Sequence, residues 1–287
     1  MPYRGDRPCS VRVVLCGVRG SLPATGADYQ EIGGATSCVA IAHDGQAPSL
    51  VLDAGTGLRR LAMMLKPNPF RGTIIMGHLH WDHILGIPFF PSGDHPDADV
   101  RFLVPEQGLD VLEVLSRAMR PPLFPISPAQ LRGAWRFATY DEGECELEGF
   151  TVLAREIPHG GGRTMGLRIS DGHSSIAYLS DHSPHSIGPG DDGLGELHPA
   201  ALDLASDVDV LIHDSQYTKG ELVQKFTWGH TAVPYCVTLA ERCNVKTLMM
   251  FHHDPMRTDD DVRALAATLH SDTVDIQIGV EGLEIQL

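Results

Sequence analysis

Short apolar runs alternate with glycine- and proline-rich segments along most of the chain. Runs rich in valine, isoleucine and leucine are typical of β-strands, and apolar residues at helical spacing are typical of amphipathic helices. The first pattern predicts strands at residues 10–17, 37–43, 49–53, 73–76, 100–104, 150–157, 164–170, 175–180, 208–213, 247–251 and 274–278. The second predicts helices at residues 56–65, 108–119, 231–243 and 258–270.

The order of these elements indicates the fold class. Strands come in runs with helices interleaved, and strict strand–helix alternation is missing. This order favours the α+β class, with two sheets covered by helices in a four-layer αββα sandwich, over a single doubly wound sheet. No linker or charge run divides the sequence, so we expect one domain over residues 1–287. Residues 120–139 are rich in proline and aromatic side chains and predict an irregular surface insertion.

The charge balance limits the kinds of molecule that the protein is expected to bind. The chain has 22 lysines and arginines against 37 acidic residues, a net charge of −15. A protein that holds long nucleic acid by its phosphates usually carries a basic face. No lysine or arginine cluster is visible here, which argues against long nucleic acid as a partner. A small phosphate-bearing substrate fits, because bound cations supply local positive charge that the total hides.

Cysteines and apolar runs indicate the compartment. The six cysteines are scattered with no C-x-x-C pair, as expected for free thiols in a reducing environment. Residues 1–10 are polar and lack the charged-then-apolar signature of a secretory signal. No apolar run approaches the roughly 18 residues that a transmembrane helix needs. We expect a cytoplasmic protein with no membrane partner.

The strongest chemical signal is the string His-Leu-His-Trp-Asp-His at residues 78–83. Three imidazoles and a carboxylate on a tight loop that leaves a strand can converge on two adjacent metal ions. Imidazole and carboxylate ligands suit Zn²⁺, Mn²⁺ or Fe²⁺. A histidine-rich surface loop is the alternative. The apolar strand before the string and Ile84-Leu85-Gly86 after it place it instead at the edge of the core.

This H-x-H-x-D-H string resembles the signature of the metallo-β-lactamase superfamily. Further segments follow in that family's order. Asp53-Ala54-Gly55 looks like its D-x-G turn, and lone candidate ligands follow at His159, Asp181 and His252. The resemblance covers residues 11–255 and implies a metal-dependent hydrolase.

The resemblance also implies a set of ligands for two divalent ions, three on each ion and one that bridges both. They are His78, His80 and His159 for the first ion, Asp82, His83 and His252 for the second, and Asp181 as the bridge. His253 is the alternative to His252. We prefer His252 because the family places its last histidine directly after a strand, three residues before a proline.

Two more segments resemble the phosphodiesterase branch of the superfamily. Residues 211–215 look like its H-E-A segment, and residues 228–232 like its G-H-S-T segment. In that branch the histidine matching His230 donates a proton or stabilises the transition state, and the acid matching Asp214 orients it. Aspartate is one methylene shorter than the usual glutamate, so a purely structural strand-end carboxylate is the other interpretation of Asp214.

The glycine-rich opening resembles small bacterial members of the same branch. Their pattern is close to G-T-R-G-S-x-P followed by Y-G-G-N-T-S-C, and this chain has Gly-Val-Arg-Gly-Ser-Leu-Pro and Ile-Gly-Gly-Ala-Thr-Ser-Cys at residues 17–23 and 32–38. Arg19, Thr36 and Ser37 are therefore candidates for contacting a substrate phosphate. The alternative is that the glycines only make a turn.

Together these features predict a metal-dependent phosphodiesterase that hydrolyses a small or cyclic phosphodiester, such as a cyclic nucleotide. A hydroxide that bridges the two ions would attack phosphorus, with His230 as the proton donor. Asp82 and Asp181 would reduce the net charge of the metal pair and fix its spacing.

Three other functions stay open. A tRNA 3′-processing endonuclease would share the ligands, but it needs a basic binding surface. A lactone or thioester hydrolase would share them too, without needing Asp214 and His230. A non-catalytic binding module is the weakest alternative, because every ligand position is filled. Residues 121–128 suggest either a homodimer contact or a lid over the active site.

Overall fold

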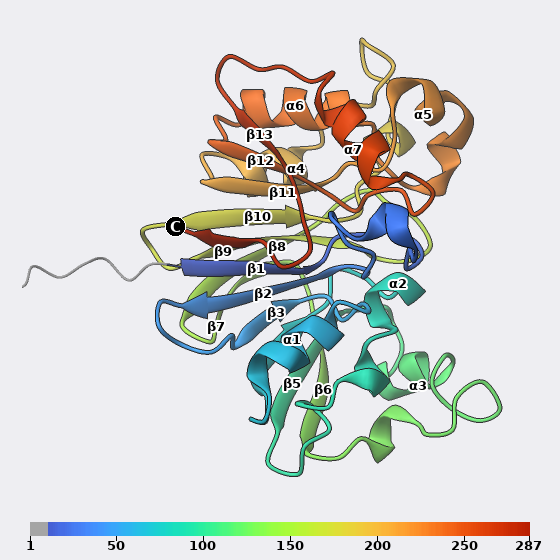
Figure 1. Ribbon diagram of the computed structural model, residues 1–287, viewed down its shortest axis with the longest axis vertical. Coiled ribbons are helices and arrows are strands. Elements are labelled where there is room, and N and C mark those ends of the chain that lie inside the picture. Colours follow the sequence, from blue (N-terminus) through green and yellow to red (C-terminus); the bar gives the residue numbers. More distant parts are fainter. Residues whose placement is uncertain (1–10) are drawn as a thin grey trace, which may run out of the picture.

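The computed structural model describes residues 11–287 and arranges their strands in two mixed β-sheets that pack face to face (Figure 1). Helices cover the outer side of each sheet, so the layers follow one another as helix, sheet, sheet and helix. This arrangement confirms the predicted α+β class and the four-layer αββα sandwich.

The first sheet comes mainly from the N-terminal half of the chain. In spatial order its strands are β14 (Glu284–Gln286), β1 (Val11–Gly17), β2 (Cys38–His43), β3 (Leu50–Leu52), β4 (Arg71–Ile75), β5 (Asp99–Pro105) and β6 (Ala134–Tyr140). Strands β1, β2 and β3 pair antiparallel, and β3 to β6 run parallel.

The second sheet comes mainly from the C-terminal half. In spatial order its strands are β13 (Asp275–Ile278), β12 (Thr247–Phe251), β11 (Val210–Asp214), β10 (Ser175–Leu179), β9 (Met165–Ser170), β8 (Phe150–Glu156) and β7 (Gly143–Leu147). Strands β10 to β13 run parallel, and β7 to β10 pair antiparallel.

The helices divide between the two outer faces (Figure 1). They are α1 (Leu58–Leu65), α2 (Trp81–Ile84) and α3 (Val111–Ser116) beside the first sheet, and α4 (Pro199–Ala205), α5 (Lys219–Lys225), α6 (Val233–Arg242) and α7 (Asp259–Ala266) beside the second. Capping boxes start two of them, because the Thr218 and Thr258 hydroxyls accept hydrogen bonds from backbone amides of the first turn.

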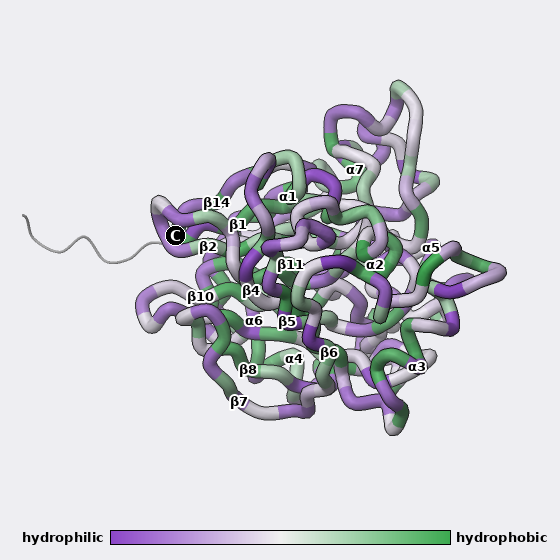
Figure 2. Tube along the Cα trace, turned by 90° about the horizontal axis from the view of Figure 1, so that it is seen from below, coloured by the Kyte–Doolittle hydropathy of each residue, from purple (hydrophilic) through white to green (hydrophobic). Residues whose placement is uncertain are grey.

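Alternation along the strands separates the apolar side chains into layers. On β1, Val13 and Leu15 point between the two sheets and share a cluster with Phe251 of β12. Val14 and Cys16 point the other way, into the layer that packs on α1. A third cluster joins the second sheet to α4 and α6. In Figure 2 the hydrophobic positions, in green, gather within the molecule and many outer loops are purple.

The carboxyl ends of parallel strands from both sheets meet at one edge of the sandwich. Strands β3 and β4 end there in the first sheet, and β10, β11 and β12 end there in the second. Because loops that follow such strand ends lie together, side chains distant in sequence converge at this edge. The loops carry Asp53, residues 77–83, Asp181 and His252, whose side chains are in contact.

The predicted insertion at residues 120–139 is wrong in its second half. Residues 134–140 form β6, the edge strand of the first sheet, in parallel register with β5. Trp135 and Phe137 turn inward onto the core, while Arg136 between them faces solvent. This period-two alternation is the strand signal, and the proline content of the preceding residues obscured it.

Other differences concern short elements. The strands β7 and β14 and the helices α2, α4 and α5 were not predicted, and the helix expected at residues 108–119 is reduced to Val111–Ser116. Residues 1–10, on which the prediction of a missing secretory signal rests, lie outside the described residues. Within residues 11–287, no helix has the length and apolar character required to cross a bilayer.

Candidate metal centre and active site

The metal-ligand string lies where β4 leaves the first sheet. After Ile75 the chain turns through Gly77 into a loop that carries His78 and His80, and α2 then begins at Trp81. The short helix places Asp82 and His83 on the buried side, next to the loop histidines. Three of the four candidate ligands of this string are therefore buried, and His80 is exposed at the mouth of the cluster.

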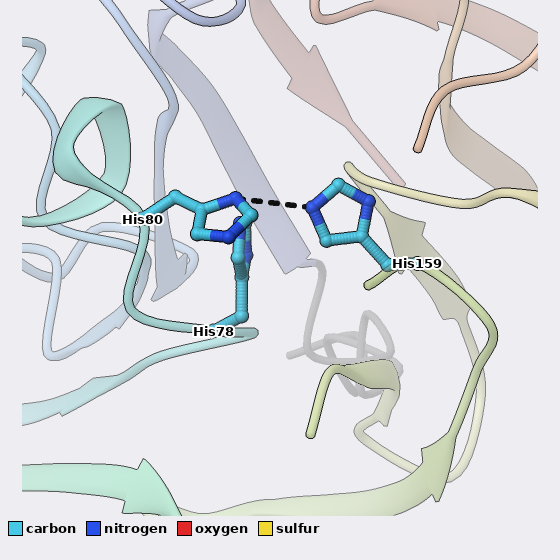
Figure 3. A group of neighbouring side chains, drawn as sticks. All are labelled: His78, His80 and His159. Carbon is cyan, nitrogen blue, oxygen red and sulfur yellow. Dashed lines mark hydrogen bonds between the residues drawn. The ribbon is translucent and has the colours of Figure 1, made fainter. Parts of the chain in front are cut away.

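The first group of ligands consists of His78, His80 and His159. Figure 3 shows His78 and His80 on one loop and His159 reaching toward them from the loop after β8. The His159 Nε2 atom lies 3.1 Å from Nδ1 of His80. One ligand atom from each of the three residues lies within 4.8 Å of the others, so one cation can contact all three.

The second group consists of Asp82, His83 and His252. Oδ2 of Asp82 lies 3.2 Å from Nε2 of His83 and 3.1 Å from Nε2 of His252. His252 follows β12 directly and holds a left-handed backbone conformation with φ of 55°. Such a conformation is uncommon for a residue with a side chain. Here it turns the imidazole back toward the strand ends.

Asp181 lies between the two groups. Its Oδ1 atom is 3.8 Å from Nε2 of His78 and 3.8 Å from Nε2 of His159. Its Oδ2 atom is 3.1 Å from Nε2 of His83. Oδ1 also lies 3.4 Å from Nε2 of His252, so the carboxylate contacts imidazoles of both groups. This is the position that a bridging carboxylate needs.

The donors of this centre fit divalent cations. Within the described residues, both ring nitrogens of His78, Nε2 of His83 and Oδ2 of Asp181 are buried and have no hydrogen-bond partner. Buried polar atoms without a partner are rare because their desolvation is not compensated. Cations bound by these lone pairs would compensate it. The imidazole and carboxylate set matches borderline ions such as Zn²⁺ or Mn²⁺.

Burial and charge set the protonation of the ligands. Burial lowers the pKa of His78 and His159, and nearby imidazoles lower it further. Their rings are therefore neutral near pH 7, with a lone pair free for a metal. Burial acts to lower the pKa of His83 as well, but the carboxylates of Asp181, Asp82 and Asp53 raise it overall. The same negative charge attracts a cation.

Hydrogen-bonding partners outside the candidate ligand set orient the ligand side chains. Asp53, in a left-handed conformation with φ of 60°, accepts hydrogen bonds from Nδ1 of His83 at 2.7 Å and from the Tyr178 hydroxyl at 2.7 Å. Nδ1 of His159 lies 2.6 Å from the Gly229 carbonyl, and Nδ1 of His252 lies 2.9 Å from Oε1 of Gln216. Such contacts fix the tautomer of a ligating imidazole.

His230 lies beside the two groups and is held by Asp214. Nδ1 of His230 is 2.9 Å from Oδ2 of Asp214, the last residue of β11, and 3.8 Å from Oδ1 of Asp181. Burial lowers the pKa of the His230 imidazole. The ring also lines a hollow of about 360 Å³ at the mouth of the cluster, together with Ser21, Trp81 and Asp82. The structure thus brings together His230 and Asp214 as the sequence pattern predicts.

Residues 49–253 match the family described as the beta-lactamase superfamily domain. The chain is a hydrolase of the metallo-β-lactamase superfamily. The match begins before β3 and ends after β12, so it contains every candidate ligand.

Relatives of this hydrolase include ribonuclease Z of Streptococcus mutans, 25% identical over 77% of this chain and 86% of the relative. Ribonuclease Z of Streptococcus agalactiae is 23% identical over the same shares of the two chains.

Among solved structures, the metallo-β-lactamase fold protein YhfI from Bacillus subtilis has a TM-score of 0.72 at 17% identity, over 96% of this chain and 99% of that one. A diphosphatase from the PhnP family has a TM-score of 0.70 at 17% identity, over 97% of both chains. The short form of human tRNase Z has a TM-score of 0.66 at 16% identity, over 96% of this chain and 98% of that one.

His253, the alternative last ligand, points away from the centre of the hydrolase. Its Nε2 atom lies 2.9 Å from the Gly279 carbonyl, and burial lowers the pKa of its ring to about 3. His252 is instead the residue in contact with Asp82. Gly20 makes room for it, because a Cβ atom there would stand 2.3 Å from the His252 ring. The geometry therefore favours His252.

The expected phosphate contacts of Arg19 are corrected by the structure. Its side chain is fully buried, and its guanidinium donates hydrogen bonds to the carbonyls of Gly33 and Arg257 and to Oδ1 of Asp259 at 2.8 Å. These protein acceptors occupy the guanidinium, and burial keeps it from a substrate. Arg19 instead ties the loop after β1 to the start of α7.

Thr36 and Ser37 are also buried below the metal loop and do not face the hollow. The Thr36 hydroxyl donates a hydrogen bond to the Asp82 carbonyl at 2.6 Å, and the Ser37 carbonyl accepts one from the Gly55 amide. The glycine-rich segment at residues 17–23 contacts the centre through its backbone, because the Ser21 amide donates a hydrogen bond to Oδ2 of Asp82 at 2.7 Å. These segments support the ligands from below.

Sequence reasoning missed several supporting groups. Asp53 was noted only as part of a turn motif, although its place directly after a strand, as for Asp181, is the signal that could have identified it. Gln216 and the Gly229 carbonyl carried no such signal, because a single amide or a backbone carbonyl is indistinguishable from many others in the sequence.

Replacing Arg19 by leucine should lower the free energy of unfolding by about 3–5 kcal/mol, because the Asp259 carboxylate would stay buried without its partner. Urea denaturation followed by circular dichroism measures this change. Arg132→Ala is the matched control. Arg132 also pairs with a carboxylate, Asp94, but its side chain is 70% exposed, so its loss should matter far less. Equal effects of the two substitutions would contradict the structural role of Arg19.

Replacing Asp181 by alanine should remove bound metal, because the substitution takes away the one carboxylate that faces both groups of imidazoles. Metal content per chain, measured by plasma mass spectrometry after loading with Zn²⁺, should fall from about two ions to fewer than one. Asp203→Ala, on the surface of α4, should bind as much metal as the unchanged protein. Two ions retained by Asp181→Ala would rule out the bridging position.

Proposed function

We propose that this hydrolase is a metal-dependent phosphodiesterase that acts on a small or cyclic phosphodiester, such as a cyclic nucleotide. The observation that carries the proposal is the His230–Asp214 pair at the edge of a complete two-group ligand set. Hydrolysis of an ester needs a proton for the leaving oxygen. A histidine held beside the mouth of the metal centre can supply it.

Two divalent ions would be held in this centre. His78, His80 and His159 are the ligands proposed for one ion and Asp82, His83 and His252 those for the other, with Asp181 shared. When bound, such ions lower the pKa of water and neutralise phosphoryl oxygens. Asp82 and Asp181 limit the positive charge of the pair, and the bond from His83 to Asp53 keeps its other nitrogen directed at the centre.

His230 would act on the leaving group. Its Nδ1 atom is bonded to Asp214, which fixes the plane of the ring, and its side chain lines the hollow over Asp82 and Asp181. Burial favours the neutral ring, whereas the carboxylates of Asp181 and Asp82 favour the protonated one. The protonated ring would pass its proton to the departing alkoxide and so remove the charge that forms as the bond to phosphorus breaks. Asp214 is then a positioning residue that acts through His230.

The charges around the mouth support a small substrate. Its lining residues are Ser21, Leu79, His80, Trp81, Asp82, Asp181 and His230, which include no lysine or arginine. A tRNA is held through many phosphates along its length. The net charge of −15 adds to this argument.

A tRNA 3′-processing endonuclease is the second candidate. It is favoured by the two relatives named ribonuclease Z, which this chain matches over 86% of their length. The ligand set and the His230–Asp214 pair would serve that reaction equally well. A lactone or thioester hydrolase is a third candidate on the same metal centre.

Hydrolysis assays on metal-stripped protein with added Zn²⁺ or Mn²⁺ separate these candidates. We expect metal-dependent release of nitrophenol from bis(p-nitrophenyl) phosphate and turnover of a cyclic nucleotide. We expect none with a lactone or a thioester, and no cleavage of a tRNA precursor with a 3′ extension. Cleavage of the precursor would favour the endonuclease, and activity on the lactone or thioester alone would overturn the proposal.

Replacing His230 by alanine should lower kcat on bis(p-nitrophenyl) phosphate by roughly 10²- to 10⁴-fold, the usual contribution of a general acid. Bound metal should stay unchanged, since His230 is outside the proposed ligand set. Asp214→Asn should cause a smaller loss. His270→Ala, whose side chain is 84% exposed, is the control. Full activity of His230→Ala would show that another group provides the proton.

A further inference from the structure

Trp81 is strongly exposed, although the candidate ligands Asp82 and His83 that follow it are buried. It is the first residue of α2, between His80 and Asp82, and the indole is 72% exposed. An exposed tryptophan leaves a large apolar surface in water at a cost in free energy. A single exposed apolar residue is common, but one that joins a larger apolar hollow is a candidate for ligand binding.

Trp81 lines two hollows that adjoin at this residue and at Leu79. One is the mouth of the metal centre, which His230 and Asp181 also line. The other is a hollow of about 550 Å³ whose walls are almost entirely apolar, formed by Leu79, Trp81, Val114, Leu115, Ala118 and Leu123. A molecule with a polar group in the mouth can therefore place an attached apolar group in the second hollow.

The second hollow has one cation at its wall. Arg117 lies one turn after Glu113 and pairs with it at 3.1 Å, with both side chains more than half exposed. Arg117 also lines a third hollow that contains His78, His80 and Gly160. An exposed ion pair of this kind is weak and is readily exchanged for a ligand contact. The hollow thus combines a flat aromatic face with a nearby guanidinium.

We propose that this apolar hollow is the subsite for the base of a nucleotide whose phosphate lies at the metal centre, with Trp81 as the stacking surface. The inference rests on the proposed function and names its substrate class as nucleoside phosphodiesters. A base offers a flat π-face to an indole, and such stacking contributes without reading the sequence of the base. The wall leucines cover the edges of the ring.

Binding of adenosine 5′-monophosphate and ribose 5-phosphate to the full-length, zinc-loaded protein tests this subsite by calorimetry. The two probes share the sugar phosphate and differ in the base. We expect the adenosine nucleotide to bind at least about tenfold more tightly, the usual effect of one stacked base. Trp81→Ala should abolish that difference and leave ribose 5-phosphate binding unchanged, and Trp81→Phe should keep most of it.

Phe89→Ala is the matched control. Phe89 is aromatic and 64% exposed on η2 (Ile87–Phe89), and it lines neither the mouth nor the apolar hollow, so both affinities should be unchanged. Hexyl phosphate tests for a general apolar site. If Trp81→Ala weakens hexyl phosphate as much as the nucleotide, the hollow takes any apolar group and the base subsite is wrong.

Equal affinity of the unchanged protein for the two sugar phosphates would also overturn the subsite. Because these measurements need no turnover, they are independent of the assays of the proposed function. If the unchanged protein prefers the nucleotide but has no phosphodiesterase activity, the proposed function is wrong and the base subsite stands. Hydrolysis of bis(p-nitrophenyl) phosphate without a base preference would overturn the subsite alone.

Discussion

The buried carboxylate of Asp181 is the contact on which the rest of the centre depends. One of its oxygens lies near the imidazoles of His78, His159 and His252 and the other near that of His83, and the residue is almost completely buried. Burying a carboxylate is costly unless opposite charge or hydrogen bonds compensate it. The His83 imidazole, whose pKa the surrounding carboxylates raise, provides only part of that compensation. The sandwich therefore brings together, at one edge, negative charge and free lone pairs that divalent cations can satisfy.

Asp53 explains how two separate sheets hold such a centre in register. It follows β3 of the first sheet, yet it accepts a hydrogen bond from Tyr178 of β10 in the second sheet as well as from His83. A second oxygen accepts the Gly77 amide at the start of the metal loop. One buried carboxylate thus ties the loop, the ligand helix and the opposite sheet together. This network therefore fixes the orientation of the candidate ligands.

The sequence alone indicates most of the candidate ligand set, because those residues form local patterns at strand ends. The string at residues 78–83 contains its own spacing, and Asp181 and His252 directly follow apolar runs. Arg19 could not be assigned in this way, since its partner Asp259 lies 240 positions away and only the folded chain shows that the guanidinium is enclosed. The edge strand β6 was not predicted because about half of its side chains are exposed and its larger apolar residues are aromatic. Next to a proline-rich segment, this composition is typical of irregular surface loops.

The proposed function offers one physical explanation for both the acidic composition and the exposed Trp81. A protein that recognises a long phosphate backbone must spread positive charge over its surface, whereas a protein that recognises one phosphodiester needs it only at the centre, where bound cations can provide it. The rest of the affinity must then come from the groups attached to the phosphate. An aromatic platform next to the mouth supplies such affinity without adding charge. Surface acidity and a local apolar hollow are thus complementary features of the small-substrate site that we propose.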